Sequence, residues 1–229
     1  GTGMGKTLGF AIPVIVDALI SNRAEGRVCS QLLMYPRNSL AKDQFAEIEG
    51  YVKQVNNSLI RSDEKERCIG IAIDADGLLK KKKDSFPGTL KDKPQWNVGG
   101  KNVYDSASEI YGKDKPASII ACSIESFRRR LKYPEVSLGL KRGLRRIVFD
   151  EVHLSSGTQG AHHSKLISRC RQIIFDLDFW INHRRSKNLN FIGVSATIAK
   201  PKSHVGKISS QSAINVTHVN ASSEETISN

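Results

Sequence analysis

The chain opens with a glycine-rich run that constrains its fold more than any other feature. Residues 1–7 read Gly-Thr-Gly-Met-Gly-Lys-Thr. They close the phosphate-binding pattern G-x-x-x-x-G-K-[ST], whose opening residue would precede Gly1. Glycines let successive backbone N–H groups turn toward phosphate oxygens, and a helix that follows presents its positive end to the same anion. The apolar run 8–20 is typical of such a helix. The alternative interpretation is a flexible glycine-rich terminus.

This pattern predicts a nucleotide site with ATP and Mg²⁺ as its ligands. Lys6 is expected to reach the β- and γ-phosphates, and the Thr7 hydroxyl is expected to ligate Mg²⁺. A loop of this kind joins a strand to a helix, so we expect a strand before Gly1 and regard the chain as a fragment whose first strand is missing. The predicted nucleotide-binding residues are Thr2, Gly3, Met4, Gly5, Lys6 and Thr7.

Short apolar runs alternate with helical patterns along the rest of the chain. The runs are nearly continuous in apolar residues, which is typical of strands covered on both faces. Strands that alternate with helices indicate an α/β fold, a parallel sheet with helices on both faces. The predicted strands are 31–35, 68–73, 118–122, 146–149 and 190–194, and the later predicted helices are 39–55, 125–131 and 161–177.

Two adjacent acids follow one of these apolar runs. Residues 145–153 read Arg-Arg-Ile-Val-Phe-Asp-Glu-Val-His. Paired acids at the end of a buried strand are costly unless a cation or a proton transfer uses them. Opposite a phosphate loop, Asp150 is expected to hold the Mg²⁺ and Glu151 to activate the attacking water. The alternative is an ordinary acid pair in solvent at the end of a strand.

Composition narrows the class of partner. The chain has 35 Lys and Arg against 23 Asp and Glu, a net charge of +12. Such an excess favours a nucleic-acid partner, and a solubility surface is the alternative. Four widely spaced cysteines with no C-x-x-C argue against zinc and disulfides and fit the reducing cytoplasm. No apolar stretch approaches the length of a membrane helix.

Two segments differ from the α/β pattern. Residues 74–116 are rich in Lys, Asp, Gly and Pro and are longer than an ordinary loop. They read as a basic insertion, either simply solvated or facing nucleic acid with Trp96 or Tyr104 stacked on a base. Residues 209–229 read as a linker with a terminal strand at 214–219, which leaves 1–208 as the main domain.

The order of the motifs resembles the first RecA-like motor domain of superfamily-two DEAD/DEAH-type helicases. Residues 1–7 look like motif I, Asp-Glu-Val-His at 150–153 like motif II, and Ser-Ala-Thr at 195–197 like motif III. The run YPRNSLAKDQ at 35–44 is similar to motif Ia. The stretch DEVHLSSGTQGAHHSKLISRCR at 150–171 is similar to the DEVH-box DNA helicases of the MrfA type, as is the run from Ser195 to Pro201 with His204.

The resemblance implies further roles for single residues. In the family the motif II histidine contacts motif III, so His153, Ser195 and Thr197 are expected to couple the ATP state to the grip on the strand. Motif Ia cradles phosphates of the tracking strand, although Arg37 and Ser39 stand here where the family has Thr and Ala. The segment 122–127 takes the place of motif Ib without its usual T-P or T-N pair. The implied nucleic-acid contacts are Pro36, Arg37, Asn38, Ser39, Ser123 and Arg128.

Other residues keep two interpretations. Arg128, Arg129 and Arg130 follow each other on a helix and read equally well as strand contacts or as a solvated face. His162 and His163 suggest a metal only weakly, because adjacent residues diverge on a helix, and we interpret them as packing or capping groups.

The resemblance implies an ATP-dependent helicase or translocase that grips phosphates, with DNA favoured over RNA and a second RecA-like lobe in the full-length chain. Without that lobe, residues 1–229 are expected to bind nucleotide weakly and to be inactive as an ATPase. Two other functions fit the same motifs: the double-strand DNA translocase of a restriction or defence complex, and an RNA remodeller or ATP-switched clamp. The intact Asp150–Glu151 pair argues against a clamp with little turnover.

Overall fold

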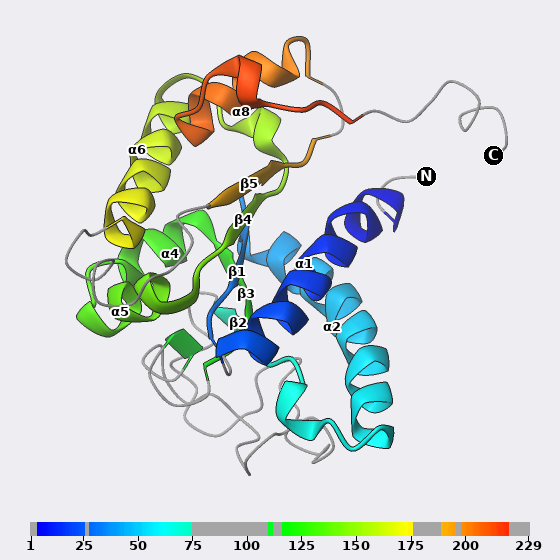
Figure 1. The fold of residues 1–229 in the computed structure, drawn as a ribbon. Coiled ribbons are helices and arrows are strands. Elements are labelled where there is room, and N and C mark those ends of the chain that lie inside the picture. The colour runs from blue at the N-terminus through cyan, green and yellow to red at the C-terminus, as the bar shows by residue number, and fades with distance from the viewer. Residues whose placement is uncertain are drawn as a thin grey trace, which may run out of the picture.

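Five parallel strands form the centre of the molecule (Figure 1). The computed structural model describes residues 4–25, 28–74, 110–111, 116–175, 189–195 and 198–219. In this part of the chain the sheet order is β2-β3-β1-β4-β5, and every pair is parallel. This confirms the predicted α/β fold. The strands are β1 (Gln31–Tyr35), β2 (Ile71–Asp74), β3 (Ile119–Ser123), β4 (Arg146–Phe149) and β5 (Asn190–Gly193).

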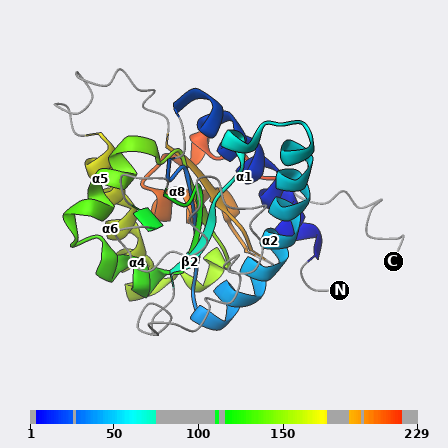
Figure 2. The same ribbon diagram turned by 90° about the horizontal axis from the view of Figure 1, so that it is seen from below.

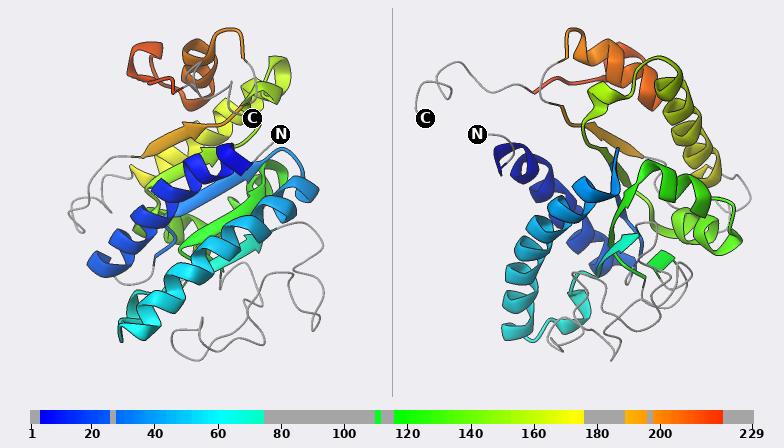
Figure 3. Two further views of the ribbon diagram at one scale, coloured as in Figure 1. Left: turned by 90° about the vertical axis from the view of Figure 1, so that its right-hand side faces the viewer. Right: turned by 180° about the vertical axis from the view of Figure 1, so that it is seen from behind.

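Helices cover both faces of the sheet, as Figures 2 and 3 show. On one face lie α1 (Met4–Glu25) and α2 (Asn38–Arg61). On the other face lie α4, α5 and α6, and α8 packs against α6. The bounds of this second group are α4 (Ile124–Arg130), α5 (Pro134–Gly143), α6 (Gly157–Ile174) and α8 (Pro201–Ser209).

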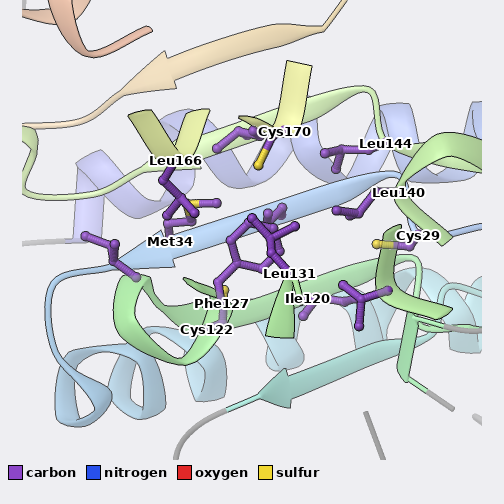
Figure 4. Close-up of a cluster of buried hydrophobic side chains, with 14 of the residues drawn as sticks. Cys29, Met34, Ile120, Cys122, Phe127, Leu131, Leu140, Leu144, Leu166 and Cys170 are labelled. Carbon is purple, nitrogen blue, oxygen red and sulfur yellow. The ribbon is translucent and has the colours of Figure 1, made fainter. Parts of the chain in front are cut away.

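Alternate side chains of each strand belong to two separate hydrophobic cores, because successive side chains of a strand point to opposite faces of the sheet. On β1, Leu33 and Tyr35 pack toward α1 and α2, while Leu32 and Met34 pack toward the helices of the other face. Figure 4 shows part of the second core, where Met34 lies among side chains of α4, α5 and α6. Burying an aliphatic side chain of this size contributes about 1.5–3 kcal/mol. Two-sided burial therefore explains why these strands read as continuous apolar runs.

The start of β2 differs from the prediction, which had the strand at 68–73. The side chain of Asn56 on α2 takes the place of a neighbouring strand at this point. Its amide donates to the Ile69 carbonyl at 2.9 Å and accepts from the Ile69 N–H at 2.8 Å. Regular strand pairing begins at Ile71 and continues to Asp74. The chain just before Ile71 is thus buried and hydrogen-bonded without being strand.

Asp74 also corrects the expected limits of the basic insertion, since it is the last residue of β2 and is fully buried. Ile110 and Tyr111 are fully buried as well and belong to the core. The described ends of the segment 74–116 are therefore part of the folded domain. Residues 75–109 and 112–115, including Trp96 and Tyr104, lie outside the described residues.

The terminal strand predicted at 214–219 is wrong. Residues Ala213–Asn215 form a short 3₁₀ turn, and 216–219 are neither helix nor strand. Ile214 is 92 % exposed and Val219 is 88 % exposed. A strand needs a neighbouring edge to pair with, and no described strand lies alongside this segment. Strand propensity alone did not decide its structure.

Candidate active site

The carboxyl ends of the strands bring the predicted motifs to one edge of the sheet. Tyr35 is in register with Ser123, and Phe149 is in register with both Met34 and Gly193. The residues that follow these positions therefore leave the sheet side by side. This is where parallel α/β sheets bind ligands.

The phosphate-loop pattern runs into the first turn of α1, which begins at Met4. Thr2 and Gly3 lie outside the described residues, and Gly5 is part of the helix. The first N–H groups of a helix have no partner within the helix, so this end is suited to an anion. Lys6 is exposed. The helix expected after the glycine-rich run is therefore present.

Thr7 is held in place by a residue that the sequence did not single out. Its side chain is 2 % exposed, and its hydroxyl donates to Gln44 Oε1 at 2.7 Å. Gln44 lies on α2, so this contact joins the start of α1 to α2. The signal was present in the run at 35–44, whose last residue is this glutamine.

Asp150 is a buried acid without an ion pair among the described residues. It is 8 % exposed, and one of its carboxylate oxygens accepts the Glu151 N–H at 2.8 Å. Burial raises the pKa of Asp150 above its usual value, although the Glu151 N–H and the charge of Lys6 act in the opposite direction. A cation at this edge would remove the cost of keeping the carboxylate charged.

Glu151 adopts a left-handed backbone conformation, with φ 48° and ψ 43°. A residue with a side chain loses roughly 1–2 kcal/mol there. Such conformations occur where the surrounding structure holds them and are concentrated at functional sites. Its side chain is about one-third exposed, so the carboxylate can meet solvent or a ligand.

His153 connects this acid to the segment predicted as motif III. Its Nδ1 lies 3.0 Å from the Ser195 hydroxyl, a hydrogen bond whose direction depends on the tautomer. The same Nδ1 lies 3.1 Å from Glu151 Oε2, without a hydrogen bond between the two atoms. The structure therefore brings His153 and Ser195 together as predicted. Thr197 lies outside the described residues.

The predicted nucleic-acid contacts differ in how exposed their side chains are. Arg37 and Ser39 are exposed, whereas Pro36 and Asn38 are half-buried. Ser123 is 4 % exposed, and its hydroxyl accepts the Ser126 N–H at 3.2 Å as the N-cap of α4. The structure thus gives Ser123 a capping bond, and its contact with nucleic acid stays a prediction.

The three arginines of α4 divide between two acidic partners, which the sequence left undecided. Arg128 donates two hydrogen bonds to Glu125, at 2.7 and 2.9 Å, and Arg129 donates a third at 3.1 Å. Arg130 instead contacts both carboxylate oxygens of Asp74 at 3.1–3.2 Å. Two of the arginines are therefore at the surface and the third is tied to the core.

The two histidines of α6 have different surroundings, and only His163 packs as predicted. His163 Nδ1 lies 2.8 Å from the Ser155 hydroxyl, and its ring packs against Phe149. Burial lowers the pKa of His163, which favours the neutral ring. His162 is exposed. Within the described residues no group of three or more His, Cys, Asp or Glu could hold a metal ion.

The cysteines are buried and free, and burial raises the pKa of Cys29 and of Cys170 to about 12. Thiols in such surroundings stay protonated and unreactive. None of the helices in the described part of the chain is long and apolar enough to cross a membrane.

Comparisons with known proteins support the fold. No family model matches the chain, and no curated protein matches it significantly. Among solved structures, the DUF1998 helicase MrfA bound to DNA matches 92 % of the chain with 21 % identity and a TM-score of 0.58. A second structure of MrfA matches the same share with 22 % identity and a TM-score of 0.56. The matched region is 23 % and 25 % of those chains, so this chain spans about a quarter of their length. These matches show that the α/β fold of this chain is similar to that of the matched region of MrfA.

Proposed function

We propose that this chain is the nucleotide-binding, RecA-like lobe of an ATP-dependent helicase or translocase that acts on DNA. The main support is one arrangement of residues. The start of α1 with Lys6, the Asp150–Glu151 pair and the His153–Ser195 hydrogen bond share the carboxyl edge of one sheet. The likeness of the fold to a DNA-bound helicase adds support.

In this proposal the nucleotide lies at the start of α1. Backbone N–H groups of residues 2–7 and the Lys6 ammonium bind the phosphates. Thr7 and Asp150 hold Mg²⁺, a role that fits a buried hydroxyl and a buried carboxylate without a cation partner in the described structure. Mg²⁺ favours sites with one or two carboxylates and substrate phosphates, and it neutralises charge on the transferred phosphoryl group.

Hydrolysis is assigned to Glu151, which orients a water and accepts its proton. Its contact with His153, together with the His153–Ser195 hydrogen bond, gives a route by which the state of the nucleotide site reaches the segment after β5. Ser195 and Thr197 complete this coupling group.

The nucleic-acid strand is assigned to the end of β1 and the start of α4. Arg37, exposed beside half-buried Asn38, supplies charge to backbone phosphates, and Arg128 lies at the surface of α4. A motor that grips phosphates has little sequence preference, in keeping with the net charge of +12. A second RecA-like lobe would complete the ATP site and move against this one.

The sharpest test uses Glu151→Gln and Lys6→Ala in the full-length protein. Glu151→Gln should keep ATP and Mg²⁺ binding but lower kcat by about 10²–10⁴-fold, because an amide accepts no proton. Lys6→Ala should weaken nucleotide binding itself. Glu135→Gln, on α5 at the other face, is the matched control and should behave as the wild type. Wild-type turnover in Glu151→Gln would refute the assignment.

The substrate is tested by comparing single-stranded DNA, duplex DNA and RNA as activators of the ATPase. Strongest stimulation by single-stranded DNA, with displacement of an annealed strand, supports a helicase. Stimulation by duplex DNA without displacement supports a translocase instead, and stimulation by RNA alone supports an RNA remodeller. ATP binding without stimulated turnover would support a clamp.

A further inference from the structure

His204, on α8, reaches back to the turn that carries the two acids. Its Nε2 lies 2.8 Å from the Val152 carbonyl oxygen. A carbonyl oxygen only accepts, so Nε2 carries a proton and donates it here. The same carbonyl oxygen also accepts the Ser155 N–H at 3.0 Å. His204 therefore holds the Val152–His153 peptide, the second peptide after Glu151.

The helix that carries His204 is seated closely on this turn. A Cβ added to Gly193 would lie 2.8 Å from Val205 Cγ2 and 3.4 Å from Val152 Cγ1. Only a glycine at the end of β5 lets α8 and the acidic turn approach so closely. The far end of α8 is held as well, since the Ser210 hydroxyl lies 2.9 Å from the Ser168 hydroxyl on α6. The helix that carries His204 is thus held in place, and so is the hydrogen bond from His204 to the Val152 carbonyl.

Glu151 stands between anchored peptides. Before it, the Asp150 N–H donates to the Met34 carbonyl at 3.0 Å. After it, the Val152 N–H donates to the Val194 carbonyl at 2.9 Å, and His204 holds the Val152 carbonyl. Left-handed backbone at a residue with a side chain persists only when its surroundings hold it. Loss of one anchor frees the Val152 peptide to rotate and the Glu151 carboxylate to turn away.

We propose that His204 is a positioning residue for ATP hydrolysis, which holds Glu151 in its left-handed conformation through the Val152 carbonyl. This inference rests on the proposed function. It extends the coupling between motifs beyond His153 and Ser195, because α8 follows the motif III segment directly. A shift of that segment would move His204, and with it the turn that aims Glu151.

The test compares His204→Ala with His204→Gln in the full-length protein. The Gln side-chain amide can donate from a position close to that of Nε2. His204→Ala should lower kcat by about 10–100-fold, because a misplaced catalytic group costs that much, and should leave the Kd for a fluorescent ATP analogue within about twofold. His204→Gln should recover most of the loss. Lys202→Ala, exposed on the same helix, is the matched control.

A second readout does not depend on activity. Hydrogen–deuterium exchange of the segment 151–155 should quicken in His204→Ala while α8 stays protected. Exchange that quickens throughout α8, with no recovery in His204→Gln, would mean that His204 only holds the helix in place and would overturn the proposal, as would wild-type kcat in His204→Ala. Loss of turnover in Glu151→Gln, with His204→Ala unaffected, would refute this inference alone. A wild-type protein that never hydrolyses ATP would refute the proposed function.

Discussion

Asp74 is the last residue of β2 and Asp150 directly follows β4, and both are buried, but their carboxylates have opposite surroundings. Arg130 contacts both oxygens of Asp74 at 3.1–3.2 Å, and the Tyr111 hydroxyl donates to it at 3.2 Å. Asp150 forms no ion pair with any described residue, and burial raises its pKa. A charge neutralised within the domain serves the fold, whereas a buried charge without a cation is suited to a ligand.

The largest expected effect is the loss of ATPase activity when Asp150 is replaced, which distinguishes it from Asp74. Asp150→Asn should lower the ATPase rate of the full-length protein by about 10³-fold, since a metal ion contributes several kcal/mol to the reaction. The same change should not lower the free energy of unfolding of the nucleotide-free protein, because it removes a buried charge. Steady-state ATPase assays and urea unfolding measure the two quantities. A less stable Asp150→Asn at neutral pH would contradict the comparison.

The pH dependence of this stability difference has a definite sign. The folded state raises the pKa of Asp150, so folded protein holds its proton at a higher pH than the unfolded chain does. The wild type therefore loses stability as pH rises from 3.8, the usual pKa, through the folded value. Asn does not titrate, and the advantage of Asp150→Asn should grow over that window and then stay constant.

The next effect concerns Asp74 and falls on stability. Asp74→Asn should lower the free energy of unfolding by about 2–3 kcal/mol, somewhat less than for a fully buried pair because the Arg130 side chain is 21 % exposed. Arg130→Met should also destabilise the protein. The double variant should lose less than the sum of the two, as expected for residues in contact. Additive losses would show that the Arg130 contact does not explain the burial of Asp74.

The smallest effect extends the comparison to an exposed acid, Glu125. The hydrogen bond from Arg128 is the main reason that the pKa of Glu125 falls to about 2. Its contribution to stability is present above pH 4.5 and is lost as pH falls from 4.5 through about 2, but an exposed ion pair contributes little. Glu125→Gln should therefore leave stability nearly unchanged.

The same variant tests the proposed strand contact, because Glu125→Gln frees Arg128. If Arg128 faces nucleic acid, affinity should rise slightly and its salt dependence should steepen by up to about 0.7 log units per log unit of salt, the share of one phosphate. Binding measured from low to high salt checks this. An unchanged slope would place Arg128 away from the strand.

Sequence patterns predicted the strands well where both faces are buried. β1 and β4 begin and end as predicted, because their apolar runs are continuous and short. Two helices were missed, α5 and α8, although each has a proline near its first position, a recognised start signal. The prediction of a strand at 214–219 was wrong, because no strand in the described part of the chain offers its apolar residues an edge to pair with.

Helix α1 illustrates why patterns alone do not orient an element. Apolar residues lie on several of its sides, and Leu8, Ile12 and Ile20 are each more than 40 % exposed, whereas Val14 and Ala18 are fully buried. Periodicity identifies a helix but does not rank two apolar faces. The position of the sheet made that choice.

The sequence by itself determined the α/β fold and the order of the phosphate loop, the acid pair and the Ser-Ala-Thr run, because these depend on local patterns and spacing. Only the tertiary structure decided which charged groups meet. It paired Arg130 with Asp74 while leaving Asp150 without a cation in the described structure, and it brought His204 to the Val152 carbonyl across 52 residues. Such contacts follow from how strands and helices are ordered in space, which one-dimensional periodicity does not encode.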